Sequence, residues 1–273
     1  MGTFIQWKNF EALLPYANMF KEGLITTVLL ALFTVLIGFV LGLLLSVMRM
    51  SNIRPFLWLA HAFPDTFGFF ERDRNGMLRD SGFLYHLGRF NHLSFLATAY
   101  VEVIRSTPVL VQVMVIYFGV FSQLFSLPSF KIFGFIAFNR FFPGVVALAM
   151  NSGAYLCEII RSGLQSVEGG QTEAARSLGL SQLQNMRFII LPQALKNILP
   201  AIANEFVTII KESAITYTIG VQDIMAMVQA IKSATYIIME PLLVATALYF
   251  CLCFPLSKLI AYIERRMSRG DRR

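Results

Sequence analysis

Four polar residues in a long apolar stretch of this 273-residue chain have the spacing of one helical face. They are Glu205, Thr208, Glu212 and Thr216, and steps of three and four residues place side chains on the same side of an α-helix. The two carboxylates are separated by about 10 Å along the axis, at 1.5 Å per residue. Carboxylates in such a stripe can hold an ammonium or guanidinium group through charge-assisted hydrogen bonds.

The apolar surroundings make this stripe costly. Ionisable residues at membrane depth must face a partner helix or a wet cavity, and they mark a functional site by default. One interpretation is that the stripe contacts a passing polar or cationic solute. The other is that Glu205 or Glu212 pairs with Lys211 or Arg161 and only holds the helices together. The candidate residues for a solute path are Glu205, Glu212, Thr208, Lys211, Thr216 and Asn151.

Asn151 belongs to a short run of small and polar residues, 151–154. Small residues allow two helices to approach closely, which is the favoured interpretation, and a place for Asn151 in the solute path is the alternative. Further along, Glu158 and Arg161 are three residues apart and predict an ion pair within one helix.

Arg105 and Pro108 lie in another apolar stretch. Pro108 removes a backbone donor and predicts a kink. Arg105 follows Glu102 by about one turn, so we expect the two to pair locally, and binding of a substrate carboxylate by Arg105 is the alternative.

The elements that position these residues are predicted to be membrane-spanning helices. The chain is 56% hydrophobic and only 14% charged, whereas a soluble domain carries about 25% charged residues. A helix needs about 20 apolar residues to cross the hydrocarbon core. Five runs meet this requirement, at 24–47, 96–124, 143–164, 198–219 and 239–262.

The distribution of Lys and Arg predicts the orientation. With the N-terminus outside, sixteen of them fall in internal segments and five in external ones. Because cytoplasmic segments carry the excess of Lys and Arg, we expect the N-terminus outside and the C-terminus inside. The predicted regions are an external segment 1–22, a transmembrane domain 23–265 with a cytoplasmic insertion 51–93 and an internal loop 165–196, and a basic tail 266–273.

The internal loop 165–196 contains the most specific motif of the chain. It reads Glu173-Ala174-Ala175, three residues, Gly179, nine residues, Ile189, one residue, Leu191-Pro192. Glu and Ala favour a helix and Gly179 offers a stop. We expect a second short amphipathic helix to follow and to end at Leu191-Pro192. Two short helices at an angle would form a compact knob.

This motif resembles the EAA loop of permeases in the ATP-binding cassette (ABC) importer superfamily. The start of the first span resembles the polar amino acid branch, and so do 103–108, 153–163 and 204–213. The resemblance implies an all-α integral membrane protein with the five-helix importer permease fold. It also implies that the loop couples to an ATPase through Glu173, Ala174, Ala175, Gly179, Ile189, Leu191 and Pro192, and that the fourth span lines the substrate path. Residues 62–93 depart from the family and look like an insertion.

The resemblance further implies the partners of the chain. These are ATPase subunits that use the ATP, a second permease subunit of the same or a similar chain, and an extracytoplasmic solute-binding protein, all at the bacterial inner membrane. The sequence contains no Walker-type glycine loop, zinc-helix signature or nucleophile elbow, so we expect neither an enzyme nor a cofactor on this chain. The substrate is expected to be a polar or basic amino acid, with acidic ones left open through Lys211 and Arg105. A secondary transporter or channel subunit for small polar solutes is the alternative function.

Overall fold

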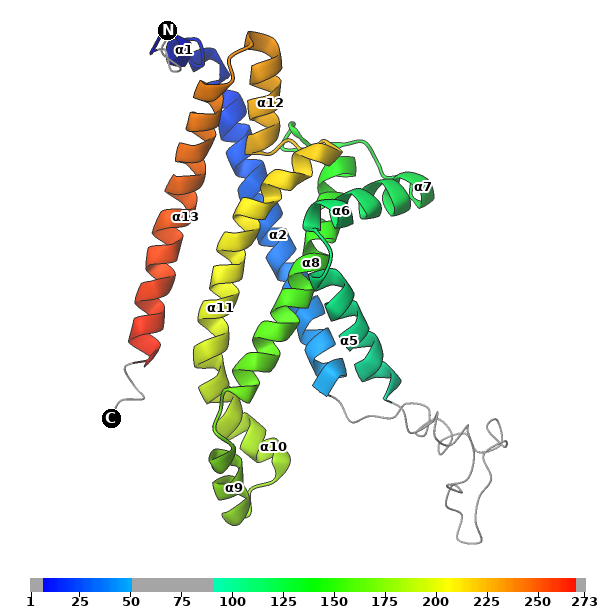
Figure 1. The fold of residues 1–273 in the computed structure, drawn as a ribbon, viewed down its shortest axis with the longest axis vertical. Coiled ribbons are helices and arrows are strands. Elements are labelled where there is room, and N and C mark those ends of the chain that lie inside the picture. Colours follow the sequence, from blue (N-terminus) through cyan, green and yellow to red (C-terminus); the bar gives the residue numbers. More distant parts are fainter. Residues whose placement is uncertain (1–6, 51–90, 269–273) are drawn as a thin grey trace.

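The protein is a bundle of helices (Figure 1), and the computed structural model describes residues 7–50 and 91–268. The long elements are α2 (Ala17–Met50), α5 (His92–Arg105), α8 (Phe138–Gln165), α11 (Leu191–Glu212), α12 (Ile224–Thr235) and α13 (Met239–Ser268). The short helices are α1 (Trp7–Glu11), η1 (Leu14–Tyr16), α6 (Val109–Met114), η2 (Val115–Phe121), α7 (Ser122–Leu124), α9 (Gly169–Ser177), α10 (Gln182–Asn185), η3 (Met186–Ile190) and η4 (Ser213–Ile219). Two short strands, β1 (Lys131–Ile132) and β2 (Ile136–Ala137), pair antiparallel.

Three helices within the described residues are long and apolar enough to cross a membrane without interruption. They are Trp7–Met50, Phe138–Gln165 and Met239–Met267. Two bent helix pairs raise the number to five if each pair is one span. The five predicted spans therefore correspond to three continuous helices and two bent pairs.

The second predicted span, 96–124, is not one kinked helix but two helices that meet at 109°. The α5 helix ends at Arg105, and Pro108 is extended at the start of α6. Proline disfavours helical geometry in the residue before it and cannot donate to the preceding turn, so the chain leaves the first axis completely. The fourth predicted span, 198–219, tightens to the 3-10 helix η4 after Glu212 and is followed by α12 at a bend of 47°.

The contact between α2 and α8 depends on small residues. A Cβ placed on Gly42 would lie 2.8 Å from the Cβ of Leu156, and one on Gly153 would lie 2.8 Å from a methyl carbon of Leu41. Helices this close need glycine at the crossing point. The small-residue run 151–154 therefore serves close packing, as the favoured interpretation of its sequence predicts.

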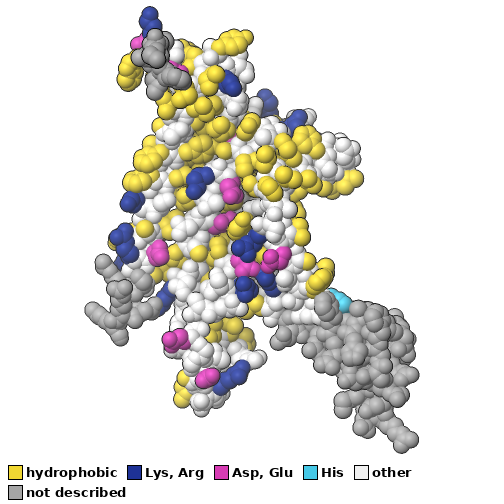
Figure 2. All heavy atoms as spheres, viewed as in Figure 1, with side chains coloured by type: hydrophobic (Ala, Val, Ile, Leu, Met, Phe, Trp, Pro, Cys, Tyr) yellow, Lys and Arg dark blue, Asp and Glu magenta, His cyan; other side chains and the backbone are white. Residues whose placement is uncertain are grey.

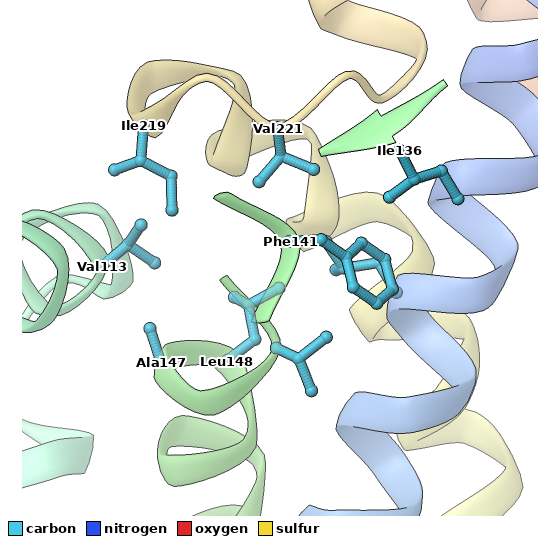
Figure 3. Packing of buried hydrophobic residues seen from close by; sticks show 9 residues of the cluster. Val113, Ile136, Phe141, Ala147, Leu148, Ile219 and Val221 are labelled. Atoms are coloured by element: carbon cyan, nitrogen blue, oxygen red, sulfur yellow. The ribbon is translucent and has the colours of Figure 1, made fainter. Parts of the chain in front are cut away.

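Buried apolar side chains near one end of α8 join five parts of the chain (Figure 3). Val113 of α6, Ile136 of β2, Leu148 of α8 and Ile219 of η4 point into this cluster. Leu30 of α2 also belongs to it. The broken span, the strand pair and the end of the fourth span are thereby held against the α2–α8 pair.

Helix α1 and the C-terminal end of α13 lie at opposite ends of the bundle, and α9 and α10 lie toward the same end as that end of α13 (Figure 1). An odd number of crossings requires this arrangement. Near the N-terminal end, Asn9 donates to Glu240 at the start of α13, at 2.8 Å. Helix α2 begins at Ala17, within the predicted external segment 1–22. Residues 51–90 of the predicted insertion and residues 269–273 of the predicted tail lie outside the described residues.

Replacing Gly42 with Ala should lower the thermal unfolding midpoint of the purified protein in detergent, because the added methyl group meets the Cβ of Leu156 and the backbone of Cys157. Overpacking of this kind costs about 1–3 kcal/mol. The matched control is Gly119→Ala, whose methyl group would have one contact at 4.0 Å. Equal unfolding midpoints for the two variants would contradict the close approach of α2 and α8 at Gly42.

Candidate functional site

The polar stripe of α11 faces α8 at its first member. The hydroxyl of Ser152 donates to a carboxylate oxygen of Glu205 at 3.0 Å, and Glu205 is 8% exposed. Ser152 is fully buried within the small-residue run of α8. Glu205 is therefore held between two helices by a neutral partner, and neither Lys211 nor Arg161 pairs with it within the described residues.

The other members of the stripe have different surroundings. The hydroxyl of Thr208 donates to the carbonyl of Asn204 in its own helix, at 3.2 Å. Glu212 is half-buried at the end of α11, and Lys211 is exposed. Thr216 follows in η4, fully buried, and donates to the carbonyl of Ser213 at 2.8 Å. The expectation of one continuous α-helical face therefore holds only as far as Glu212, because the winding of the chain changes there.

Asn151 does not face open space but supports the break between α5 and α6. Its amide donates to the side-chain oxygen of Gln112 at 2.9 Å. The amide nitrogen of Gln112 in turn donates to the carbonyls of Ile104, at 2.7 Å, and Thr107, at 3.0 Å. Backbone carbonyls freed by a break at membrane depth need such partners. Gln112 is absent from the site residues predicted from the sequence, although a single Gln four residues after Pro108 in an apolar run is a usable signal.

A cluster of charged side chains joins α2, α5 and α8. Glu158 accepts hydrogen bonds from Arg49 on one oxygen and from Arg161 on the other, the latter at 2.8 Å. The predicted pair of Glu158 and Arg161 is therefore confirmed. The expected pair of Arg105 and Glu102 is wrong: Glu102 lies 3.7 Å from Arg49, and Arg105 lies 3.9 Å from Glu158. Arg49 is absent from the site residues predicted from the sequence, because its partner Glu158 is 109 positions away.

The loop between α8 and α11 folds as a compact knob, which we define as residues 169–190. Gly179 adopts a left-handed conformation, with φ of 78°, directly after α9. The amides of Gly179 and Leu180 donate to the carbonyls of Arg176 and Ala175, which is the Schellman arrangement that ends a helix. Ser181 and Gln184 then form a capping box at the start of α10. Three large apolar side chains of this knob are more than 60% exposed, namely Leu178, Leu183 and Phe188.

The second helix of the knob does not end at Leu191-Pro192, as the sequence analysis expected. The chain continues from α10 through the π-helix η3 directly into α11. Pro192 is the second residue of α11, directly after η3, and it lacks the amide that would bond to the preceding turn. The side chain of Gln193 donates to the carbonyl of Ile189 in the preceding turn at 3.0 Å.

Residues 82–269 match the family model described as the binding-protein-dependent transport system inner membrane component. The chain belongs to this family. It is an integral membrane protein, and the resemblance inferred from the loop 173–192 is confirmed. Its bundle of helices and bent helix pairs is the fold of importer permeases.

Curated relatives and solved structures agree with this assignment. The chain is 34% identical to the arginine transport system permease protein ArtQ of Bacillus subtilis (strain 168), over 96% of this chain and 99% of that one. It is 30% identical to the probable glutamine ABC transporter permease protein GlnM of the same organism, with the same coverage. A crystal structure of an amino acid ABC transporter with histidines matches at 38% identity and a TM-score of 0.73, over 94% and 98% of the two chains. The MetNI methionine ABC transporter in inward-facing conformations shares the fold, with a TM-score of 0.63 at 18% identity over 93% and 98%.

Replacing Gln112 with Met should destabilise this membrane component while keeping the volume of the side chain nearly constant. The carbonyls of Ile104 and Thr107 and the amide of Asn151 would each lose a partner, at about 1–3 kcal/mol per buried group left unsatisfied. Thermal unfolding in detergent measures the loss. Ser162→Ala is the control, because that exposed hydroxyl donates only within its own helix. A Gln112→Met protein as stable as the parent would contradict this role for Gln112.

Proposed function

We propose that this chain is the permease subunit of an ATP-driven importer of polar or basic amino acids, and that it forms the substrate path together with a second copy or a similar chain. The observation that supports this proposal is a column of charged side chains at membrane depth. Figure 2 shows acidic and basic side chains gathered down the middle of one face, over the region of α5, α8 and α11. A surface of this kind is costly against lipid, so it needs water or a protein partner.

The knob is the proposed site where a separate ATPase subunit drives the permease. Its exposed apolar side chains Leu178, Leu183 and Phe188 form the kind of surface that a protein partner covers. Because η3 continues into α11 without a loop, a displacement of the knob is passed directly to the helix that carries Glu205 and Glu212. The coupling residues are Glu173, Ala174, Ala175, Gly179, Ile189, Leu191 and Pro192.

We place the knob and the C-terminus in the cytoplasm and the N-terminus outside. The excess of Lys and Arg in the internal segments supports this orientation. A solute-binding protein then delivers the substrate to the outer end, where α1 and α12 lie. ATP is consumed on the ATPase subunits, and the permease needs no cofactor of its own.

The substrate is proposed to be a polar or basic amino acid, because the carboxylates of Glu205 and Glu212 suit an ammonium or guanidinium group. The names of the relatives, which are arginine and glutamine transport permeases, support this class. Family membership favours an importer over the alternative of a secondary transporter or channel.

Gly179→Ala should weaken the association of the permease with its ATPase. No atom lies within 4 Å of the added Cβ, so the cost arises from the left-handed backbone of Gly179, at about 1–2 kcal/mol for an L-residue. Unwinding of this turn would displace α10 and the apolar side chains of the knob. Copurification of the ATPase with tagged permease measures the effect. The control is Gly170→Ala, whose added Cβ also meets no neighbour and whose backbone is not left-handed. Equal recovery of the ATPase with both variants would show that Gly179 has no role in coupling.

Glu212→Gln should lower the uptake of a basic amino acid into proteoliposomes that contain the complete transporter. A hydrogen bond to a charged group contributes about 1.5–3 kcal/mol, so we expect a loss of about tenfold or more in apparent affinity. Assembly with the ATPase should be unchanged, because Glu212 is distant from the knob. The control is Glu264→Gln, which removes an exposed carboxylate near the end of α13. If the Glu212 variant takes up the substrate as well as the control does, Glu212 does not line the path.

A further inference from the structure

Arg105 is held in place by its neighbours, but its side-chain N–H groups donate no hydrogen bond within the described residues. It is the last residue of α5, directly before the 109° break. Its guanidinium lies over the ring of Tyr155, 5.5 Å from the centroid, and 3.9 Å from a carboxylate oxygen of Glu158. Within the described part of the chain its side-chain N–H groups donate no hydrogen bond, and 40% of the side chain is exposed. A guanidinium in this state is ready to bind an anion.

The neighbouring carboxylate, Glu158, is bonded more closely to two other arginines than to Arg105. One oxygen of Glu158 accepts from Arg49, and the other accepts from two nitrogens of Arg161, at 2.8 and 3.3 Å. The second carboxylate of the cluster, Glu102, is 63% exposed and lies 3.7 Å from Arg49. Three guanidinium groups therefore share two carboxylates, so the cluster has an excess of one positive charge, and Arg105 is its most exposed cation. At membrane depth such a charge needs water or an anion beside it.

Arg105 and Glu205 contact nearby positions of α8. Ser152 of α8 bonds to Glu205, and Tyr155, three residues later, stacks on Arg105. Three residues correspond to about 4.5 Å along a helix. Groups that attract a cation and an anion thus flank the same turn of α8. A zwitterion has its own opposite charges separated by a few bonds and matches this arrangement.

We propose that Arg105 binds the α-carboxylate of the transported amino acid through its guanidinium fork, while Glu205 and Glu212 attract the cationic end. The planar guanidinium fits a carboxylate with two parallel hydrogen bonds. Tyr155 and Glu158 hold the fork in place without occupying its donors. The permease then selects for a free carboxylate in its own path, in addition to any selection by the binding protein. This inference rests on the proposed transport of amino acids.

The test compares an amino acid with the amine that remains when its carboxyl group is removed. The membrane complex of permease and ATPase subunits is used without the binding protein, because that protein would bind the ligand itself. The ligands are the amino acid that the complete transporter takes up best and the corresponding decarboxylated amine. Dissociation constants for both are measured by equilibrium dialysis in neutral-lipid nanodiscs for the parent complex and for Arg105→Gln, Arg105→Lys and Arg161→Gln.

We expect Arg105→Gln to weaken binding of the amino acid by about tenfold or more, the loss of a charge-assisted pair, and to leave binding of the amine unchanged. Arg105→Lys should recover part of the affinity, because lysine keeps the charge but not the fork. Arg161→Gln removes the same charge from the same cluster, but the guanidinium of Arg161 is engaged by Glu158 and Gln165. That control should change the binding of both ligands by the same factor.

Three results would overturn the inference. The first is unchanged binding of the amino acid to the Arg105→Gln complex. The second is an equal loss of affinity for both ligands, which indicates a structural role for Arg105. The third is a parent complex that binds the amine as tightly as the amino acid. A parent transporter that takes up no amino acid would instead overturn the proposed function itself. The two failures can be told apart, because this one is a loss of uptake by the parent protein, whereas the three results above concern binding.

Discussion

The hydrocarbon core of a membrane offers no hydrogen bonds, so every backbone group freed at membrane depth must find a partner within the protein. The break between α5 and α6 is where this chain meets the constraint most severely. Gln112 bonds to the carbonyl of Ile104 in the last turn of α5 and to that of Thr107 within the break, and Asn151 of α8 holds Gln112 in place. The second apolar run can therefore change direction by 109° and leave Arg105 at the end of a half-length helix.

The same constraint explains the charged cluster at α2, α5 and α8. Glu158 balances Arg49 and Arg161 and joins two helices that already touch through glycine. Desolvated charges persist in a protein when they are paired and hydrogen-bonded. Arg105 lies at the edge of this network, 3.9 Å from Glu158 and 40% exposed, so it keeps contact with its surroundings while the other two arginines are engaged.

The knob and the path are parts of one continuous element. Pro192 would end a helix if it lay further inside one. Here Pro192 lies directly after the π-helix η3, where the hydrogen-bonding pattern of the helix changes, and the helix continues through it. The Schellman turn at Gly179 fixes α9 against this element. A stiff connection of this kind suits the transmission of force better than a flexible loop, because no residue between the knob and α11 has non-helical geometry.

The sequence by itself determined the features that depend on residues close together in the chain. These are the apolar helices, the stop at Gly179, the pair of Glu158 and Arg161, and the family, through a motif of twenty positions. Only the tertiary structure decided which helices are neighbours. The bonds of Ser152 to Glu205, Asn151 to Gln112 and Arg49 to Glu158 join residues 53, 39 and 109 positions apart. Helical periodicity defines the faces of each helix but not the partner that each face meets. Local spacing therefore predicted a pair of Arg105 and Glu102, whereas the packing of α5 on α8 places Arg105 beside Glu158 with its side-chain N–H donors unbonded within the described residues.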